Sequence, residues 1–395
     1  MITNVTGPLH LGPPTRLPGQ ASRATLRPST GICCATFEQC RSKAKGKTVK
    51  AGAARSGSGG KARSSGSWSD STYDKGSPPR ALSVIMPCRN VASTVADQLD
   101  ALLGQQTSVS LEIIAVDNGS SDTTLRLLNE YAIRDSRLRV VRADERTGAS
   151  YARNMGARMA KYSALAFVDA DDLVAVGWLE AMGTALAEHP FVVGALELER
   201  LNPVWLARSR GFESLGAVGQ FHHAFPYAVS GNMGIRRSLW VQLRGFDEDL
   251  TAAEDIELSL RAHQAGVELC YQPDAVVHYR YRATFSSRAQ QAVAYGLGRA
   301  SVLQALRRQE ATNPVFTMRA LLQFIRTSPA LVSRQGRAAW LWRGGVALGY
   351  VFGRIRLSHP RLAGAVCAVR GPHLRQGLPL VIALLASIHR WGRWR

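Results

Sequence analysis

The chain has 395 residues, an apolar fraction of 46% and a net charge of +20 at neutral pH. This length suits one large catalytic domain with extensions, and the apolar fraction is that of an ordinary globular core. The positive charge is confined to the ends: residues 1–80 carry a net +10, residues 288–395 carry +16, and residues 81–287 carry −6. A basic nucleic-acid-binding protein is one interpretation of such a charge, but the acidic centre contains no nucleic-acid motif, so we expect no specific nucleic acid partner.

The first 80 residues are rich in Lys, Ser and Gly and show no apolar periodicity. We therefore predict a disordered basic tail over residues 1–80. The start of the sequence contains no basic segment followed by an apolar one, so we predict no signal peptide there. The six cysteines form no CxxC pair and no Cys/His cluster with zinc spacing, which favours reduced thiols in a cytosolic compartment.

From residue 81 onward, short apolar segments alternate with segments of helical spacing. The apolar segments, typical of buried parallel strands, cover residues 82–86, 111–116, 138–142 and 164–168. Helical spacing is found at residues 91–105, 123–131 and 148–161. This alternation predicts an α/β fold with a doubly wound, mostly parallel sheet that binds its ligand at the carboxyl ends of the strands.

The rest of the central region is less regular. The predicted helices cover residues 178–189, 238–243 and 254–265, and the predicted short strands cover residues 267–271 and 275–278. A loop is predicted over residues 211–231. These elements place one catalytic domain at residues 81–287 and a separate helical region at residues 288–395.

Two acidic residues follow the fourth predicted strand. In an extended segment, residues two apart point the same way, so Asp169 and Asp171 are expected to face one side together. A divalent cation would relieve their repulsion, and carboxylate oxygens suit Mg²⁺ or Mn²⁺, which also bridge to diphosphate oxygens. An acidic loop that only caps the next helix is the alternative.

A second acidic group, Glu254 and Asp255, opens a predicted helix. Acids at that position stabilise the helix dipole, and this structural role is the simplest interpretation of the group taken alone. The functional alternative is a general base that reaches an acceptor hydroxyl.

Seven short motifs occur in order along the central region. They lie at residues 83–87, 116–122, 152–156, 167–172, 230–233, 245–247 and 253–258. Together they resemble the family 2 glycosyltransferases of the GT-A fold over about residues 82–282, which is 201 of the 395 residues. The resemblance implies an enzyme with a nucleotide-sugar donor and with Mg²⁺ or Mn²⁺ as its cofactor.

The resemblance also implies roles for individual residues around the nucleotide. Asp117 matches the acid that contacts the nucleotide base or ribose, and Pro87 and Arg89 match the neighbouring wall. Arg153 and Asn154 resemble a pair that lies near the nucleotide. All five are therefore expected to bind the nucleotide-sugar.

Further matches concern the metal and the base. Asp169 and Asp171 match the D-x-D motif for metal and ribose, and Asp255 matches the general base of inverting members. One base without a second carboxylate nucleophile implies inversion at the anomeric carbon. His278 resembles a histidine that approaches the metal or diphosphate in some members; a structural histidine at a strand end is the alternative.

The sequence departs from the family pattern in two places. Asn118 stands where a second Asp is frequent, and the Q-x-x-R-W signature of processive synthases is absent. We therefore expect single additions to a glycan or lipid-linked acceptor, in cell-envelope or extracellular glycan or glycolipid synthesis. A metal-dependent nucleotidyltransferase is the alternative enzyme, but it needs a phosphate-binding loop after the first strand, and residues 87–90 do not provide one.

The C-terminal region combines 17 arginines and one acid with an apolar sequence. It has no run of about 18–20 uncharged apolar residues, the length of a spanning helix. Either it forms an amphipathic surface that binds anionic lipid, or its arginines snorkel from a helical bundle. Four tryptophans favour the membrane interface: Trp340, Trp342, Trp391 and Trp394. The first interpretation places the protein in the cytoplasm, peripheral at the inner face of the cell membrane.

Overall fold

The computed structural model describes residues 81–209, 218–282, 284–307 and 332–358. The predicted tail over residues 1–80 and parts of the C-terminal region lie outside the described residues. The predicted loop over residues 211–231 is described from residue 218, where it contains a small hairpin of β7 (Gly219–Phe221) and β8 (Phe225–Tyr227).

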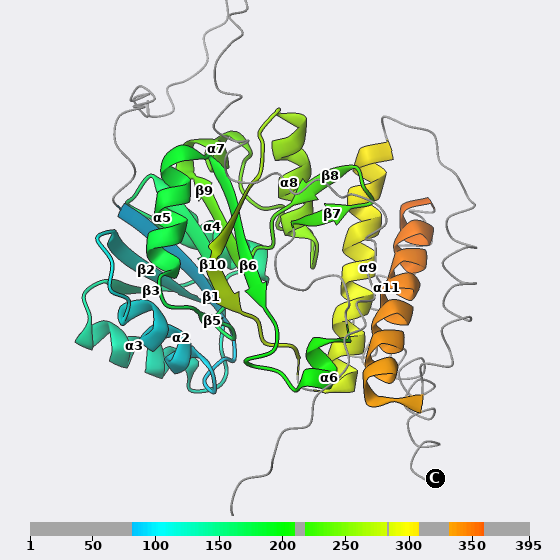
Figure 1. Ribbon diagram of the computed structural model, residues 1–395, viewed down its shortest axis with the longest axis horizontal. Helices are drawn as coiled ribbons and strands as arrows, with labels where there is room; N and C mark the ends of the chain where they lie inside the picture. The colour runs from blue at the N-terminus through cyan, green and yellow to red at the C-terminus, as the bar shows by residue number, and fades with distance from the viewer. Residues whose placement is uncertain (1–80, 210–217, 283, 308–331, 359–395) are drawn as a thin grey trace, which may run out of the picture. The chain divides into compact units, whose positions relative to one another are not determined.

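The core is an eight-stranded sheet with the strand order β3-β2-β1-β4-β9-β6-β10-β5 (Figure 1). Its strands are β1 (Ala81–Cys88), β2 (Ser110–Asp117), β3 (Leu138–Arg142), β4 (Ala164–Val168), β5 (Leu173–Val174), β6 (Phe191–Glu197), β9 (Asn232–Arg236) and β10 (Cys270–His278). The first four strands in the order pair in parallel, whereas β9 and β5 run antiparallel to their neighbours. The predicted doubly wound, mostly parallel sheet is thus confirmed.

Helices cover both faces of this sheet. They are α2 (Val95–Leu103), α3 (Thr124–Arg134), α4 (Ala149–Met159), α5 (Trp178–Glu188), α7 (Arg237–Gln242) and α8 (Glu254–Gln264). Because side chains alternate along a strand, Val84 of β1 belongs to an apolar cluster with residues of α2, α3 and α5, while Ile85 belongs to a second cluster with residues of α4, α7 and α8. Two apolar layers therefore enclose the sheet, as expected for an α/β fold.

The strand order reverses between β1 and β4, because the chain first moves outward to β3 and then returns to the other side of β1. β1 pairs with β4 only as far as Ile85 opposite Phe167, and beyond that point its pairing is with β2 alone. Ligands of doubly wound sheets bind where the strand order reverses, at the carboxyl ends of the strands. The fold therefore predicts a site beyond Cys88 and Val168.

Two long helices follow the sheet, α9 (Phe285–Arg307) and α11 (Arg334–Ser358), and they lie side by side (Figure 1). A short helix, α6 (Val204–Ala207), contacts α11. Neither long helix gathers its apolar residues on one face, so the expected amphipathic face is not present in the described part of this region. None of the described helices is both long and apolar enough to cross a bilayer.

Candidate functional site

Three predicted acids meet at the point where the strand order reverses. Asp117 ends β2, and Asp169 and Asp171 follow β4. Burial, and then the charges of Asp117, Asp171 and Asp169, raise the pKa of the Cys88 thiol at the end of β1. The acids from both neighbouring strands therefore surround the end of β1, as the topology requires.

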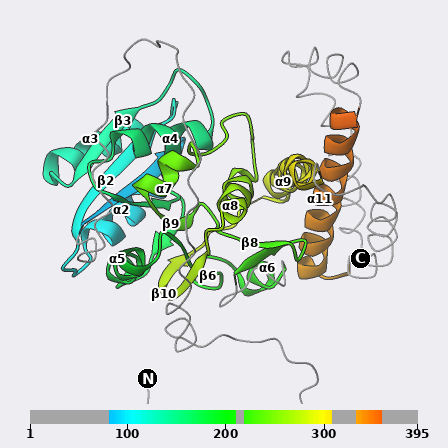
Figure 2. The ribbon, with the colours of Figure 1, turned by 90° about the horizontal axis from the view of Figure 1, so that it is seen from above.

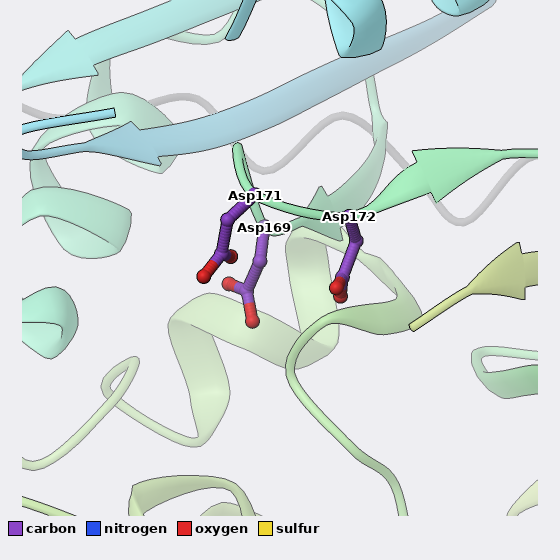
Figure 3. A group of neighbouring side chains, drawn as sticks. All are labelled: Asp169, Asp171 and Asp172. Atoms are coloured by element: carbon purple, nitrogen blue, oxygen red, sulfur yellow. The ribbon is translucent and has the colours of Figure 1, made fainter. Parts of the chain in front are cut away.

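A turn after β4 holds three carboxylates together. Oxygens of Asp169, Asp171 and Asp172 lie within 4.8 Å of one another, and Figure 3 shows the three side chains projecting from the turn to one side. Asp169 and Asp171 thus face one side together, as expected, but they do so from a turn at residues 170–172 and not from an extended segment. The buried Gln98 of α2 holds this turn, since its amide donates to the Asp169 carbonyl (2.9 Å) and accepts from the Val174 N–H (2.9 Å).

The electrostatics of this group are unfavourable without a cation. Burial, and then the charge of Asp169, raise the pKa of Asp171. Burial, and then the charges of Asp171 and Asp169, raise the pKa of Asp172 well above its usual range. Asp172 Oδ1 accepts from the Arg280 N–H (2.7 Å), while its buried Oδ2 has no hydrogen-bond partner among the described residues. A buried carboxylate oxygen without a donor is costly, so this atom fits a ligand position.

A glycine keeps space open beside these carboxylates. A Cβ atom on Gly231 would lie 2.9 Å from Asp169 Oδ2 and 3.5 Å from Asp172 Oδ2. Any other residue would fill the space between these two oxygens. With the unpartnered Asp172 oxygen, this cradle fits a hard divalent cation bound by carboxylates, the donor set that Mg²⁺ and Mn²⁺ prefer.

Arg153 of α4 connects the two acidic groups of the sequence. Its guanidinium is almost fully buried and lies 2.6 Å from Asp169 Oδ1 and 2.8 Å from Glu254 Oε1. Burial alone would lower the pKa of Arg153, but the charges of Asp169 and Glu254 raise it above its usual value. Arg153 therefore stays charged and neutralises one acid of each group.

Asn154 is used to hold a loop. Its side-chain N–H groups donate to the Phe246 carbonyl (2.9 Å) and to Glu248 Oε1 (2.8 Å), and its oxygen accepts from the Phe246 N–H (2.9 Å). Gly245 precedes this loop at a φ of +66°, and a Cβ atom on it would lie 2.7 Å from Asn154 Oδ1. Both amide donors of Asn154 are thus committed to the loop after α7, and its predicted contact with a nucleotide stays a prediction.

Asp255 lies in the first turn of α8. Its Oδ2 accepts from the Ser230 N–H (3.2 Å) and its Oδ1 from the Ile256 N–H (2.8 Å). Burial, and then the charge of Glu254, raise the pKa of Asp255 to about 7, although the two N–H groups and Arg153 oppose that rise. The Asp255 carboxyl thus contacts Ser230, and the next residue, Gly231, lines the cradle of the first acidic group.

The structure does not bring His278 into the aspartate group. Its Nδ1 lies 2.7 Å from Glu197 Oε2, and its Nε2 lies 2.9 Å from Arg200 Nη1. Both ring nitrogens are therefore engaged away from Asp169 and Asp171. The sequence signal, a lone histidine at a strand end, could not separate this structural role from a metal ligand.

The residues expected beside the nucleotide lie at the ends of β1 and β2. Pro87 is half-buried within β1, opposite Val116, and Arg89 is exposed just after the strand. Asp117 is buried, and its Oδ1 has no hydrogen-bond partner in the part of the chain that the structure describes. Asn118 donates to the Ala143 and Arg146 carbonyls, which a second Asp there could not do.

Sequence reasoning missed Asp172, Arg280 and Arg282 as members of the site. Arg280 donates through its N–H to Asp172 and through its Nε to the Asp171 carbonyl (2.8 Å). Arg282 Nη1 lies 3.9 Å from Asp171 Oδ2 and is the exposed cation next to the group. Asp172 could have been found from the run of acids after β4. Nothing in the sequence linked the arginines after β10 to the turn after β4.

Two family models together match residues 83–388. Residues 83–242 match "Glycosyl transferase family 2", and residues 200–388 match "Glycosyl transferase family group 2". The pre-mycofactocin glycosyltransferase of Mycobacterium tuberculosis is 29% identical over 263 residues, which cover 62% of this chain and 53% of that protein. The uncharacterized glycosyltransferase EpsJ of Bacillus subtilis is 28% identical over 211 residues, covering 50% of this chain and 60% of that protein. The match therefore spans little more than half the length of these relatives.

Solved structures are more distant. The mannosyltransferase PcManGT from Pyrobaculum calidifontis, in complex with GDP-Man and Mn²⁺, has a TM-score of 0.46 and 20% sequence identity, covering 82% of this chain and 90% of that chain. Similarity at this level assigns no ligand. Because the two family matches together cover the sheet, its acidic site and the helices that follow, this chain belongs to the family 2 glycosyltransferases and has their GT-A fold.

Proposed function

We propose that this glycosyltransferase moves a sugar from a nucleotide-sugar to an acceptor hydroxyl, with inversion at the anomeric carbon. One observation carries the proposal: Asp255, a carboxyl with a pKa of about 7, lies close to the group of three aspartates. Asp255 accepts a hydrogen bond from Ser230, and the adjacent Gly231 lies against Asp169 and Asp172. A base should titrate near the working pH, and a diphosphate leaving group needs positive charge.

The aspartate group would hold Mg²⁺ or Mn²⁺ through Asp169, Asp171 and Asp172. A bound divalent cation there would neutralise the charge that develops on the departing diphosphate. The exposed Arg282, next to Asp171, adds a second positive charge on the same side. Asp169 is already paired with Arg153 through one oxygen, which leaves its other oxygen facing the Gly231 cradle.

The nucleotide would lie across the ends of β1 and β2. Asp117 presents a buried oxygen without a donor among the described residues, and the hydroxyl groups of a ribose or the N–H groups of a base supply donors. Arg89 is exposed directly after β1 and would lie at the edge of that pocket. These contacts orient the donor so that its anomeric carbon faces the Asp255 side of the site.

Asp255 would accept the proton of the acceptor hydroxyl as that hydroxyl attacks. Its neighbour Glu254 is less suited to this role, because Glu254 Oε1 is 2.8 Å from Arg153 and that pairing keeps its charge neutralised. The bond from the anomeric carbon to the diphosphate breaks while the new bond to the acceptor oxygen forms. With no second carboxylate acting as a nucleophile, the configuration inverts.

A donor screen tests this proposal. The full chain is incubated with UDP-sugars and GDP-sugars and with Mn²⁺ or Mg²⁺, and release of the nucleoside diphosphate is measured. We expect release with at least one donor, increased by an acceptor glycan or lipid-linked sugar. Release of pyrophosphate from sugar phosphate and nucleoside triphosphate, without nucleoside diphosphate release, would instead indicate a nucleotidyltransferase.

We further propose that the acceptor is a glycan or lipid-linked sugar of the cell envelope, reached at an anionic membrane surface on the cytoplasmic side. The support is the positive charge of the arginine-rich C-terminal region, including the exposed Arg334 and Arg343 of α11, because α11 itself does not gather its apolar residues on one face. The protein should pellet with vesicles of anionic lipid and dissociate at high salt.

A matched pair of variants tests the membrane proposal. Arg334→Glu combined with Arg343→Glu, both on exposed positions of α11, should reduce pelleting, whereas Arg126→Glu on the exposed face of α3 should not. Equal pelleting of both proteins would reject α11 as the membrane-binding surface.

A further inference from the structure

Helix α9 packs directly against the turn that precedes the proposed base. A Cβ atom on Gly298 of α9 would overlap the Ala252 carbonyl oxygen, lie 2.7 Å from the Ala252 carbonyl carbon and lie 2.9 Å from Ala253 Cβ. Cβ atoms in proteins are not found this close to backbone atoms, so the absence of a side chain at Gly298 is what allows this contact.

The turn held by this contact is strained. Ala253 is the residue before α8 and has a φ of +63°, in the left-handed region that is unfavourable for a residue with a Cβ. Such a conformation persists only where the surrounding structure imposes it. Ala253 and Ile256 belong to an apolar cluster with Val302 and Leu303 of α9, so α9 supplies that support. Figure 2 shows α8 beside α9.

Asp255 is two residues after the strained turn. Outside its own helix, its carboxylate accepts a hydrogen bond from the Ser230 N–H, and the distance of 3.2 Å is long for a carboxylate acceptor. A displacement of the turn by a few tenths of an ångström would therefore change where the carboxyl points. We propose that Gly298 is a positioning residue for the base: α9 approaches through it and fixes the Ala252–Ala253 turn, which in turn fixes Asp255.

This inference rests on the proposed function, because it assumes that Asp255 is the base. It also gives α9 a role in positioning the base, whereas the sequence predicted a membrane-associating region, with a helical bundle as the alternative. The contact between α9 and α11 offers a matched control. A Cβ on Gly345 of α11 would lie 2.6 Å from Ala292 Cβ of α9, so Gly345→Ala disturbs the packing of the two helices without touching the turn.

The first test compares Gly298→Ala with Gly345→Ala. Misplacing a catalytic group by about 1 Å can cost about 10²-fold in rate, so kcat of Gly298→Ala should fall roughly 10–100-fold. Its affinity for Mn²⁺ alone, measured by electron paramagnetic resonance, should not change, because the aspartate group follows β4, whereas Gly298 contacts the turn before α8. Gly345→Ala should keep both values within about threefold. A kcat loss of the same size in both variants would reject the specific role of Gly298.

Val302→Ala provides a second variant that leaves a cavity instead of an overlap. It removes part of the support behind Ala253 and should lower kcat less than Gly298→Ala does, again with unchanged Mn²⁺ affinity. If Gly298→Ala does not fold and Val302→Ala has normal kcat, the inference is overturned.

A double variant separates this inference from the proposed function. If Gly298 acts through Asp255, then Gly298→Ala should cause no further loss of kcat in an Asp255→Asn protein. Losses that multiply, or normal kcat in Gly298→Ala while Asp255→Asn is impaired, would overturn the inference alone. Normal turnover in Asp255→Asn would overturn the proposed base and this inference with it.

Discussion

The two acidic groups of this glycosyltransferase contain the same kinds of residue but differ in how their charge is balanced. In the turn after β4, three carboxylates lie within 4.8 Å, and the pKa of both Asp171 and Asp172 is raised by burial and by mutual repulsion. At the start of α8 there are two acids, and one of them, Glu254, is paired with Arg153. Arg153 also pairs with Asp169, so it is shared by the two groups. The first group is then left with two further carboxylates, Asp171 and Asp172, whereas the second is left with one, Asp255.

This difference shows how one residue type performs two kinds of chemistry. Arg153 pairs with one acid of each group and leaves Asp255 as the acid whose pKa is shifted to about 7. A carboxyl whose surroundings raise its pKa toward neutrality is suited to proton transfer. We infer that the first group binds a metal and that the second provides the base, and the following predictions test that division.

The largest effect is expected from removing the metal. EDTA should lower turnover by about 10³-fold or more, because a bound cation contributes several kcal/mol to the stabilisation of the leaving group. Adding Mn²⁺ or Mg²⁺ in excess should restore the rate. Nucleoside diphosphate release at the full rate in EDTA would contradict the metal role of the aspartate group.

The next effect concerns the base. Asp255→Asn should lower kcat by about 10²–10⁴-fold, since the amide cannot accept a proton, and Glu254→Gln is the matched control that should lower it less. In the wild-type enzyme, kcat should also fall about tenfold per pH unit below about pH 7, because only ionised Asp255 is active. A dead Glu254→Gln beside an active Asp255→Asn would show that Glu254 is the base.

A smaller effect is expected from filling the cradle of the first group. Gly231→Ala places a methyl group 2.9 Å from Asp169 Oδ2, so affinity for Mn²⁺ should fall roughly 10–100-fold. Ser230→Ala, at the adjacent position, leaves the cradle open and keeps the backbone N–H that Asp255 accepts from. Titration calorimetry with Mn²⁺ compares the two, and equal affinities would mean that the space beside Gly231 is not a ligand site.

The smallest effect is on stability. The folded-state pKa of Asp255, about 7, lies above its ordinary value of 3.8, so between these pH values the folded chain holds a proton that the unfolded chain releases. Stability is therefore lost as pH rises through this window, and Asp255→Asn avoids that loss. We expect its Tm to exceed that of the wild type by roughly 2–4 °C at about pH 8 and by less at about pH 5. A larger gain at the lower pH would contradict the sign of this pKa shift.

Much of the fold follows from local sequence patterns. The four predicted parallel strands and the helices between them are present, with bounds that differ by a few residues. The strands β6 and β9 were not predicted. β9 runs antiparallel between β4 and β6, and such a placement depends on pairing between distant segments, which apolar spacing does not encode. Two short strands were predicted where the structure has one, β10. The predicted break between them coincides with a shift in the register of β10 between Gln272 and Val276.

The site was predictable where its residues lie in consecutive motifs. Asp117, Asp169 and Asp171 come together because each follows a parallel strand, and this arrangement could be predicted from topology. The pairing of Arg153 with both acidic groups could not, because it joins α4 to α8 across 101 residues of sequence. The contact of Gly298 with Ala252 was equally out of reach, since a glycine in a helix carries no local sign of what approaches it.

The most direct test of the division between the two acidic groups is the affinity for Mn²⁺ of two isosteric variants, Asp171→Asn and Asp255→Asn, measured by electron paramagnetic resonance on the full chain. Both should have strongly reduced turnover. Asp171→Asn should bind Mn²⁺ at least about tenfold more weakly than the wild type, because it loses a proposed ligand, whereas Asp255→Asn should bind Mn²⁺ as the wild type does. Equal weakening in both variants, or in neither, would contradict the assignment of metal binding to one group and proton transfer to the other.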